Sequence, residues 1–193
     1  MRDKYHTVEE LNRRIGGVFW SGEYSDFSQI EIPVNTIEVG TTQQIEAFYE
    51  NPSVRLDFER FADESLREYQ DIQKKVMKAY TDKPVTTNGT GLATNSIDYY
   101  KGFRDLDVYA FDYYPELRDS KVDTFPYAFG RGIKQGQNFW VMEFMSGGGH
   151  RFSGSGRRQP NPGALKKAVF QAFANGAGGM LHFQFRTFPF GAE

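Results

Sequence analysis

The chain has 193 residues, of which 39% are hydrophobic and 25% are charged, so it is long enough and apolar enough to fold as one soluble globular unit. A net charge of -2 does not indicate binding to nucleic acid or to an anionic membrane. No apolar run approaches the roughly 18 residues that a membrane span needs. The chain has no cysteine, and His6, His150 and His182 lack the spacing of metal ligands. We therefore expect no metal or cofactor within this chain. Its compartment stays open, with the cytoplasm favoured.

The first predicted element is a short helix that starts after Thr7, because Thr7 and Glu10 have the spacing of a capping box and Leu11 and Ile15 recur at a helical interval. From residue 18 to about residue 52 no period is sustained, which indicates a long excursion of the kind that often carries function in barrels. Residues 1–56 are therefore expected to hold a helix and a long active-site excursion. Residues 57–193 are expected to hold βα units of the same domain.

A helix over 57–80, capped by Asp57, opens this second part, because its apolar residues mark one face. Strands are then expected at 84–88, 108–113, 138–142 and 180–185. Helices are expected between them at 99–106, at 128–134 and after Asn161. Strands that alternate with helices predict a parallel α/β sheet, and a complete eight-stranded barrel is typically about 250 residues long. The fold class is therefore α/β, as the C-terminal half, about strands 5–8, of a (β/α)8 TIM barrel.

Polar side chains follow the predicted strands, at the end where parallel sheets bind ligands. Glu143 follows a buried strand and precedes a glycine-rich turn, so it is either a catalytic carboxylate or an acid satisfied by an arginine. Asp112 has the same placement, although an Asp before Tyr-Tyr-Pro is more typical of a turn cap. His182 is interpreted as a hydrogen-bonded core histidine. The remaining strand-end residues are Asn88, Arg186 and, after the last strand, Glu193.

Short motifs along nearly the whole chain together resemble the catalytic barrel of glycoside hydrolase family 42, the β-galactosidases. They occur in family order and at similar spacing. They are KYHTVEELN (4–12), GVFWS (17–21), YSDF (24–27), LDFERF (56–61), KPVTTN (83–88), DVYAFDYYP (107–115), FWVME (139–143) and FGAE (190–193).

The resemblance implies a role for each matching residue. The Glu of the Trp-Val-Met-Glu motif is the family's nucleophile, which falls on Glu143. Trp20 falls on a tryptophan that packs by the sugar, with a core tryptophan as the alternative, and Glu193 on a glutamate that hydrogen-bonds sugar hydroxyls. A family tryptophan after the nucleophile has no counterpart, and Phe152 is the residue there that could stack.

The implied reaction is retaining hydrolysis of terminal β-D-galactosides, with β-galactoside oligosaccharides as substrates. The family's acid/base glutamate lies before residue 1, so the isolated chain is expected to lack activity, even though Glu23 and Asp112 are candidate substitutes. Zinc cysteines of some members also lie upstream, so zinc is possible in that N-terminal part. A homo-oligomer, commonly a trimer, is expected from the family. Two alternatives stay open: a related barrel glycosidase acting on another sugar, and a carbohydrate-binding or scaffolding fragment without catalysis.

Overall fold

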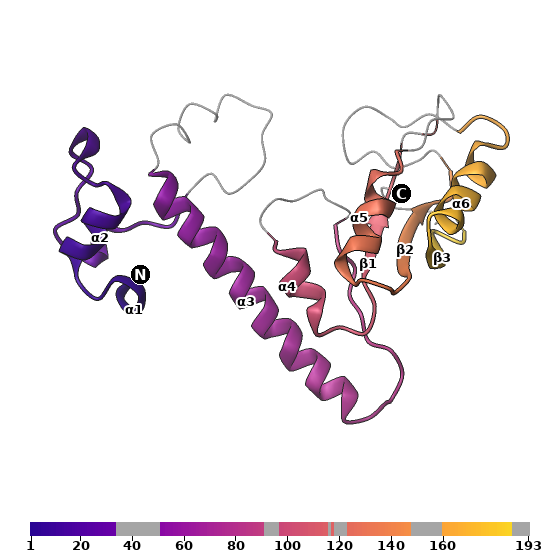
Figure 1. Ribbon diagram of the computed structural model, residues 1–193, viewed down its shortest axis with the longest axis horizontal. Helices are drawn as coiled ribbons and strands as arrows, with labels where there is room; N and C mark the ends of the chain where they lie inside the picture. Colours follow the sequence, from indigo (N-terminus) through magenta and orange to yellow (C-terminus); the bar gives the residue numbers. More distant parts are fainter. Residues whose placement is uncertain (34–50, 91–96, 116, 118–122, 148–159, 187–193) are drawn as a thin grey trace. The chain divides into compact units, whose positions relative to one another are not determined.

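The computed structural model describes residues 1–33, 51–90, 97–115, 117, 123–147 and 160–186. The chain divides into two compact units, Met1–Leu66 and Arg67–Glu193, and each is described by itself. The elements follow in chain order in Figure 1: α1 (Arg2–Tyr5), α2 (Val8–Ile15), η1 (Phe19–Ser21), η2 (Phe27–Gln29), α3 (Pro52–Lys78), α4 (Tyr99–Arg104), β1 (Ala110–Tyr113), α5 (Phe125–Ile133), β2 (Phe139–Met145), α6 (Ala164–Ala174) and β3 (Ala177–Phe183).

Helix α2 of the first unit begins after Thr7, as its sequence predicts. The Thr7 hydroxyl accepts a hydrogen bond from the Glu10 amide at 3.2 Å, which satisfies one of the free N–H groups of the first turn. The Glu10 carboxylate binds Arg13 rather than completing a capping box. At the other end, Gly16 adopts the left-handed conformation, with φ of 69°, and stops the helix.

The core of the first unit is small. It consists of Tyr5, Leu11, Ile15 and Val54, all buried. Beside it, Asp57 accepts hydrogen bonds from Lys4 and from the Tyr5 hydroxyl. Burial raises the pKa of Asp57, but these two hydrogen bonds outweigh burial and leave the pKa below its usual value.

The expectation that Asp57 caps the long helix is wrong. Helix α3 begins five residues earlier, at Pro52, and the Asn51 side chain accepts a hydrogen bond from the Ser53 amide at 2.9 Å. Asn51 therefore has the capping role, and Pro52 suits the first helical position because it lacks an N–H that would need a partner. Asp57 lies inside the helix, where its carboxylate binds α1 instead.

The second unit is built on a parallel sheet with the strand order β1-β2-β3. Helix α5 connects β1 to β2, α6 connects β2 to β3, and the two helices lie beside the strands in Figure 1. This is the α/β class that the alternation predicts. The strand expected at 84–88 is wrong, because only Gly89 pairs with β1, by an isolated parallel bridge to Phe111. The Val85 amide donates instead to the Asp107 carboxylate and the Thr86 hydroxyl to the Val108 carbonyl, so side chains replace the ladder there.

Several element boundaries also differ from expectation, and α5 and β3 each begin three residues earlier than expected, at Phe125 and Ala177. Strand β2 runs three residues further than residue 142, to Met145, so Glu143 lies within it rather than after it. Helix α6 begins at Ala164 after the left-handed Gly163, with φ of 82°, and Asn161 is not its cap. It ends at Ala174, and Asn175 and the left-handed Gly176, with φ of 100°, follow it.

Aromatic rings fill the core between the sheet and its helices. Phe111 and Phe139 are fully buried, and the Tyr127 ring of α5 stacks on Phe139 with their centroids 5.8 Å apart. A close approach of α5 makes this packing possible, because a Cβ on Gly130 would lie 3.1 Å from Phe139 and 3.2 Å from Phe111. Phe111 and Phe139 therefore mark the face of the sheet that the helices cover.

Candidate active site

Two carboxylates meet on neighbouring strands of the sheet. Asp112 of β1 and Glu143 of β2 are Cα partners in the parallel register, so they lie side by side. Both side chains are half-buried. Sequence patterns place each of them at the end of a strand, and the structure brings the two together.

A β-bulge decides which face Glu143 occupies. On β1 a single step leads from Phe111 to Asp112, but on β2 two steps separate their partners Val141 and Glu143, so Met142 is the extra residue. In an unbroken strand Glu143 would share the helix-covered face with Phe139 and Val141, because side chains alternate. The bulge moves the Glu143 side chain to the opposite face, beside Asp112. Bulges are common next to active sites for this reason.

Glu143 accepts a hydrogen bond from the Tyr114 hydroxyl at 2.7 Å, to its Oε2 atom. Tyr114 follows β1 and lies two residues after Asp112, so the strand period brings both side chains to the same face. A hydrogen bond to a carboxylate stabilises its ionised form and restricts its rotation. The sequence reading missed Tyr114, although its alternation with Asp112 on a strand that adjoins Glu143 was a usable signal.

Asp112 has a different environment. Its Oδ1 atom is buried and has no hydrogen-bond partner among the described residues. The Asn88 side chain also contacts the Asp112 carboxyl group. Burial and then the charge of Glu143 raise the pKa of Asp112 to about 6, and the Asn88 hydrogen bond opposes them. The expectation that Asp112 merely caps a turn does not describe this environment.

Trp140 lies on the same face, since its register partner on β1 is Ala110, two residues before Asp112. On its other side β3 presents glycines: a Cβ on Gly178 would lie 3.1 Å from the indole Nε1 atom, and one on Gly179 would lie 3.5 Å from the ring. Because these two residues have no side chain, the indole ring can lie against the backbone of β3. Trp140, Asp112 and Glu143 thus share one surface of the sheet.

Of the other residues singled out in the sequence, Asn88 contacts Asp112 through its side chain. Asn88 and Arg186 are exposed, and His182 is hydrogen-bonded to the Met145 carbonyl as expected but is exposed rather than in the core. Trp20 belongs to η1 of the first unit, and its side chain lies outside the described part of the structure. Phe152 and Glu193 also lie outside the described residues.

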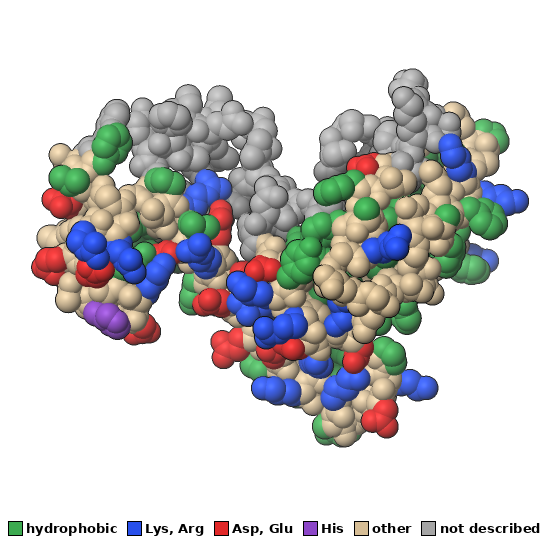
Figure 2. Space-filling model, in the orientation of Figure 1, with side chains coloured by type: hydrophobic (Ala, Val, Ile, Leu, Met, Phe, Trp, Pro, Cys, Tyr) green, Lys and Arg blue, Asp and Glu red, His purple; other side chains and the backbone are tan. Residues whose placement is uncertain are grey.

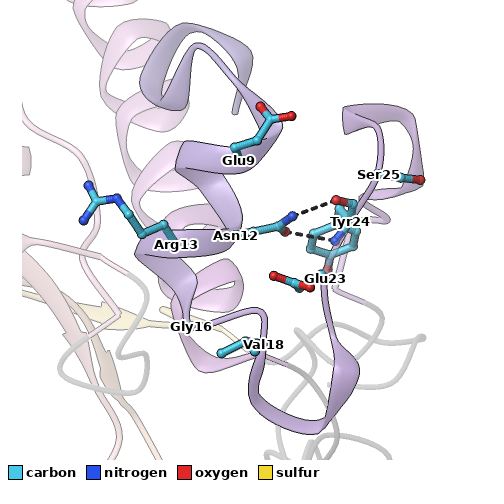
Figure 3. Close-up of a pocket in the computed structure, with 8 residues that line it drawn as sticks. All are labelled: Glu9, Asn12, Arg13, Gly16, Val18, Glu23, Tyr24 and Ser25. Carbon is cyan, nitrogen blue, oxygen red and sulfur yellow. Dashed lines mark hydrogen bonds between the residues drawn. The ribbon is translucent and has the colours of Figure 1, made fainter.

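The first unit has a hollow of its own with a volume of about 600 Å³, and its lining residues are drawn in Figure 3. Asn12 forms one wall, where its side-chain amide donates to the Tyr24 carbonyl at 2.7 Å and accepts from the Tyr24 amide at 2.9 Å. These bonds hold the segment after η1 against α2. The hollow contains Glu23, the other candidate acid. Its lining residues are Glu9, Asn12, Arg13, Gly16, Val18, Glu23, Tyr24 and Ser25.

Within the described ranges, no group of three or more His, Asp or Glu side chains could hold a metal ion. In the same part of the chain, no helix has the length and apolar character of a membrane span. Figure 2 shows acidic and basic side chains interspersed over the helices on the visible face, without a continuous basic stripe.

The parallel α/β sheet, with carboxylates aligned across neighbouring strands, is typical of an enzyme of the α/β barrel class. Comparison with known proteins identifies the group within that class. The family glycoside hydrolase 42, described as Beta-galactosidase, matches residues 1–193, and the chain belongs to this family.

Individual relatives agree with this membership. The chain is 36% identical over 199 residues to Beta-galactosidase BgaA of Clostridium cellulovorans, covering 100% of this chain and 28% of that protein. The crystal structure of a β-galactosidase from Bacillus circulans sp. alkalophilus superposes with a TM-score of 0.79 at 28% identity, covering 100% of this chain and 28% of that chain. A glutamate-to-alanine catalytic mutant of a β-galactosidase from G. stearothermophilus gives a TM-score of 0.76 at 25% identity, covering 98% of this chain and 28% of that one. The chain therefore spans less than a third of the length of these relatives.

Proposed function

We propose that this chain supplies the nucleophile part of a retaining β-galactosidase, as the C-terminal half of its barrel, with Glu143 as the nucleophile. The observation that carries the proposal is the bulge at Met142, which turns Glu143 away from the helix-covered face and beside Tyr114. Family membership supports the substrate, since the relatives are named β-galactosidases, and one solved relative is a catalytic mutant of a glutamate.

The proposed reaction has two steps. The Glu143 carboxylate attacks the anomeric carbon of a terminal β-galactoside, the glycosidic bond breaks, and the leaving oxygen takes a proton from a carboxylic acid outside this chain. Water then attacks the same carbon, its proton passes to that acid/base residue, and the ester bond to Glu143 breaks to release galactose. Tyr114 holds Glu143 in one orientation and stabilises its charge before the attack.

Three further residues are proposed to contact the sugar. Trp20 is proposed to stack on the galactose ring, Phe152 to replace the family tryptophan after the nucleophile, and Glu193 to bind sugar hydroxyls. These assignments rest on the family motifs. We also propose a homo-oligomer, as the family resemblance implies, and a location in the cytoplasm.

Replacement of Glu143 in the full-length protein tests the central assignment. Glu143→Ala should lower turnover of a nitrophenyl β-galactoside by several orders of magnitude, because loss of a covalent nucleophile removes far more than the 1.4 kcal/mol that a tenfold effect represents. Added azide should restore turnover and give the α-galactosyl azide, since azide enters the face that Glu143 vacates. Glu64→Gln, on the exposed surface of α3, is the matched control and should keep wild-type activity.

The outcomes separate the alternatives. Activity within about tenfold of wild type for Glu143→Ala, or rescue that yields the β-azide, would overturn the nucleophile assignment. A wild-type protein that binds galactosides without turnover would instead favour a carbohydrate-binding fragment.

Replacement of Trp20 tests the sugar-stacking role. Trp20→Ala should raise KM for the same substrate by a factor that corresponds to about 1–3 kcal/mol. Unchanged inhibition by galactose would return Trp20 to a core role.

A further inference from the structure

The two carboxyl groups, on the face of the sheet opposite its helices, have unequal environments. Glu143 accepts a hydrogen bond from the Tyr114 hydroxyl at 2.7 Å, which favours its charged form. Asp112 has a buried Oδ1 atom without a partner among the described residues, an environment that favours the neutral form. When two interacting carboxyl groups differ in this way, their environments decide which of the two is ionised and which holds a proton.

We propose that Asp112 is a positioning residue that holds the proton of this carboxyl pair, which leaves Glu143 as its ionised member. The proposal rests on the proposed nucleophile role of Glu143. The strand register sets the two groups side by side, and the bulge at Met142 puts them on one face.

The charged and titratable groups around Asp112 are few in the described part of the chain. Glu143 acts on it from β2 and Asn88 from the segment before α4, and Tyr114 follows it on the same strand. The pKa of Asp112, raised by burial and by Glu143 to about 6, places the loss of its proton between about pH 5 and pH 7. Above that range Asp112 carries a negative charge beside Glu143.

A second charge beside Glu143 has a predictable effect on the first chemical step. Bond formation at the anomeric carbon neutralises Glu143, which relieves the repulsion, and positive charge on the sugar is favoured by a nearby carboxylate. The rate of attack should therefore rise as Asp112 ionises. A neutral residue at position 112 should remove that rise and keep the rate at its low-pH value.

The experiment uses the full-length protein and 2,4-dinitrophenyl 2-deoxy-2-fluoro-β-D-galactoside as the probe. Glu143 forms the bond to the anomeric carbon, and dinitrophenolate leaves with the bonding electrons. This leaving group needs no proton, so the rate reports on the nucleophile rather than on the acid. The fluorine slows hydrolysis, and the labelled residue is identified by peptide mass spectrometry. The first-order rate of labelling is measured from pH 5 to pH 8.

For the wild type we expect the labelling rate to rise about threefold or more through pH 6. Asp112→Asn and Asp112→Ser should both label at the wild-type low-pH rate with no rise. Asp105→Asn, which removes an exposed carboxylate of the same unit, should follow the wild type.

Several results would overturn the inference. Asp112→Asn that follows the wild-type profile would show that Asp112 does not carry the proton. Failure of both Asp112 variants to label, while they remain folded by circular dichroism, would show that the carboxylate itself is required. A wild-type protein that is not labelled on Glu143 would reject the proposed function, and this inference with it.

Discussion

The first unit is ordered mainly by side chains bonded to backbone, and the second mainly by packed rings. In the first, Asn12 holds both polar groups of the Tyr24 backbone, and the Asn51 amide donates to the Ile15 carbonyl at 3.0 Å. Its buried apolar cluster is small. In the second, aromatic rings lie between a parallel sheet and its helices. The difference implies that the two units should respond to different substitutions, since directional bonds and close packing fail in different ways.

The largest expected effect comes from overpacking the second unit. Gly130→Val would place carbon atoms against Phe139, Phe111 and Tyr109, where even a Cβ lies 3.1–3.2 Å from each ring. Buried rings cannot retreat, so a loss of about 3 kcal/mol is expected. In the full-length protein, hydrogen exchange of peptide 139–145 should accelerate about 100-fold, while peptides of the first unit keep their rates. Gly132→Ala is the control, because its Cβ would meet only the Tyr100 hydroxyl, at 3.7 Å. Equal behaviour of the two variants would contradict the close-packing account.

A smaller effect should follow from removing the two hydrogen bonds between the Asn12 side chain and the Tyr24 backbone in the first unit. Asn12→Ala removes both hydrogen bonds to Tyr24 and should cost about 1–2 kcal/mol. Exchange in peptide 22–30 should increase about tenfold, with no change in the sheet. Arg13→Ala is the neighbouring control, since it removes only an exposed ion pair and should cost less than about 0.5 kcal/mol. Faster exchange in the sheet after Asn12→Ala would show that the two units are not independent in stability.

The smallest effect should come from the carboxyl pair, and it has the opposite sign. The pKa of Asp112 is raised by folding, so the native state binds its proton more tightly and loses stability as pH rises from about 4 through 6. Asp112→Asn should therefore stabilise the full-length protein at pH 7.5 by about 1 kcal/mol, a value reduced for solvent screening, and leave it unchanged near pH 4. Pulse proteolysis in urea at the two pH values measures the difference. A destabilised variant at pH 7.5 would mean that the Asp112 carboxylate makes bonds that its burial does not suggest.

The same contrast explains how much the sequence could predict. Strong alternation and helical periods indicated the parallel α/β class, and β1, β2 and β3 all overlap their predicted ranges. The strand at 84–88 failed because bonds to distant residues that involve side chains hold this segment: the Val85 amide donates to the Asp107 carboxylate, and the Thr86 hydroxyl donates to the Val108 carbonyl. Asp57 was misread as a cap because its partners Lys4 and Tyr5 are more than 50 residues away. Local patterns do not contain such long-range bonds.

At the candidate site, strand-end position and family motifs singled out Glu143 and Asp112, but not their mutual placement. The two residues are neighbours only because of the strand register, and this register depends on the extra residue Met142. The alternation of side chains in the sequence does not reveal such an extra residue. Tyr114 was missed for a related reason, because its bond to Glu143 joins two strands. The roles of Trp20, Phe152 and Glu193 stay predictions.

The bulge at Met142 also determines which residues of β2 face the core. Before it, odd-numbered side chains such as Phe139 and Val141 belong to the core, and after it the even-numbered Phe144 is buried. Deletion of this one residue would exchange the faces of Glu143 and Phe144, which would move Phe144 away from the helix-covered face and Glu143 into the aromatic core. Most strands tolerate a length change by shifting their ends, but here the loss of one residue would remove the Glu143 carboxylate from the face that it shares with Asp112. Residue identity at position 142 is therefore less constrained than its presence.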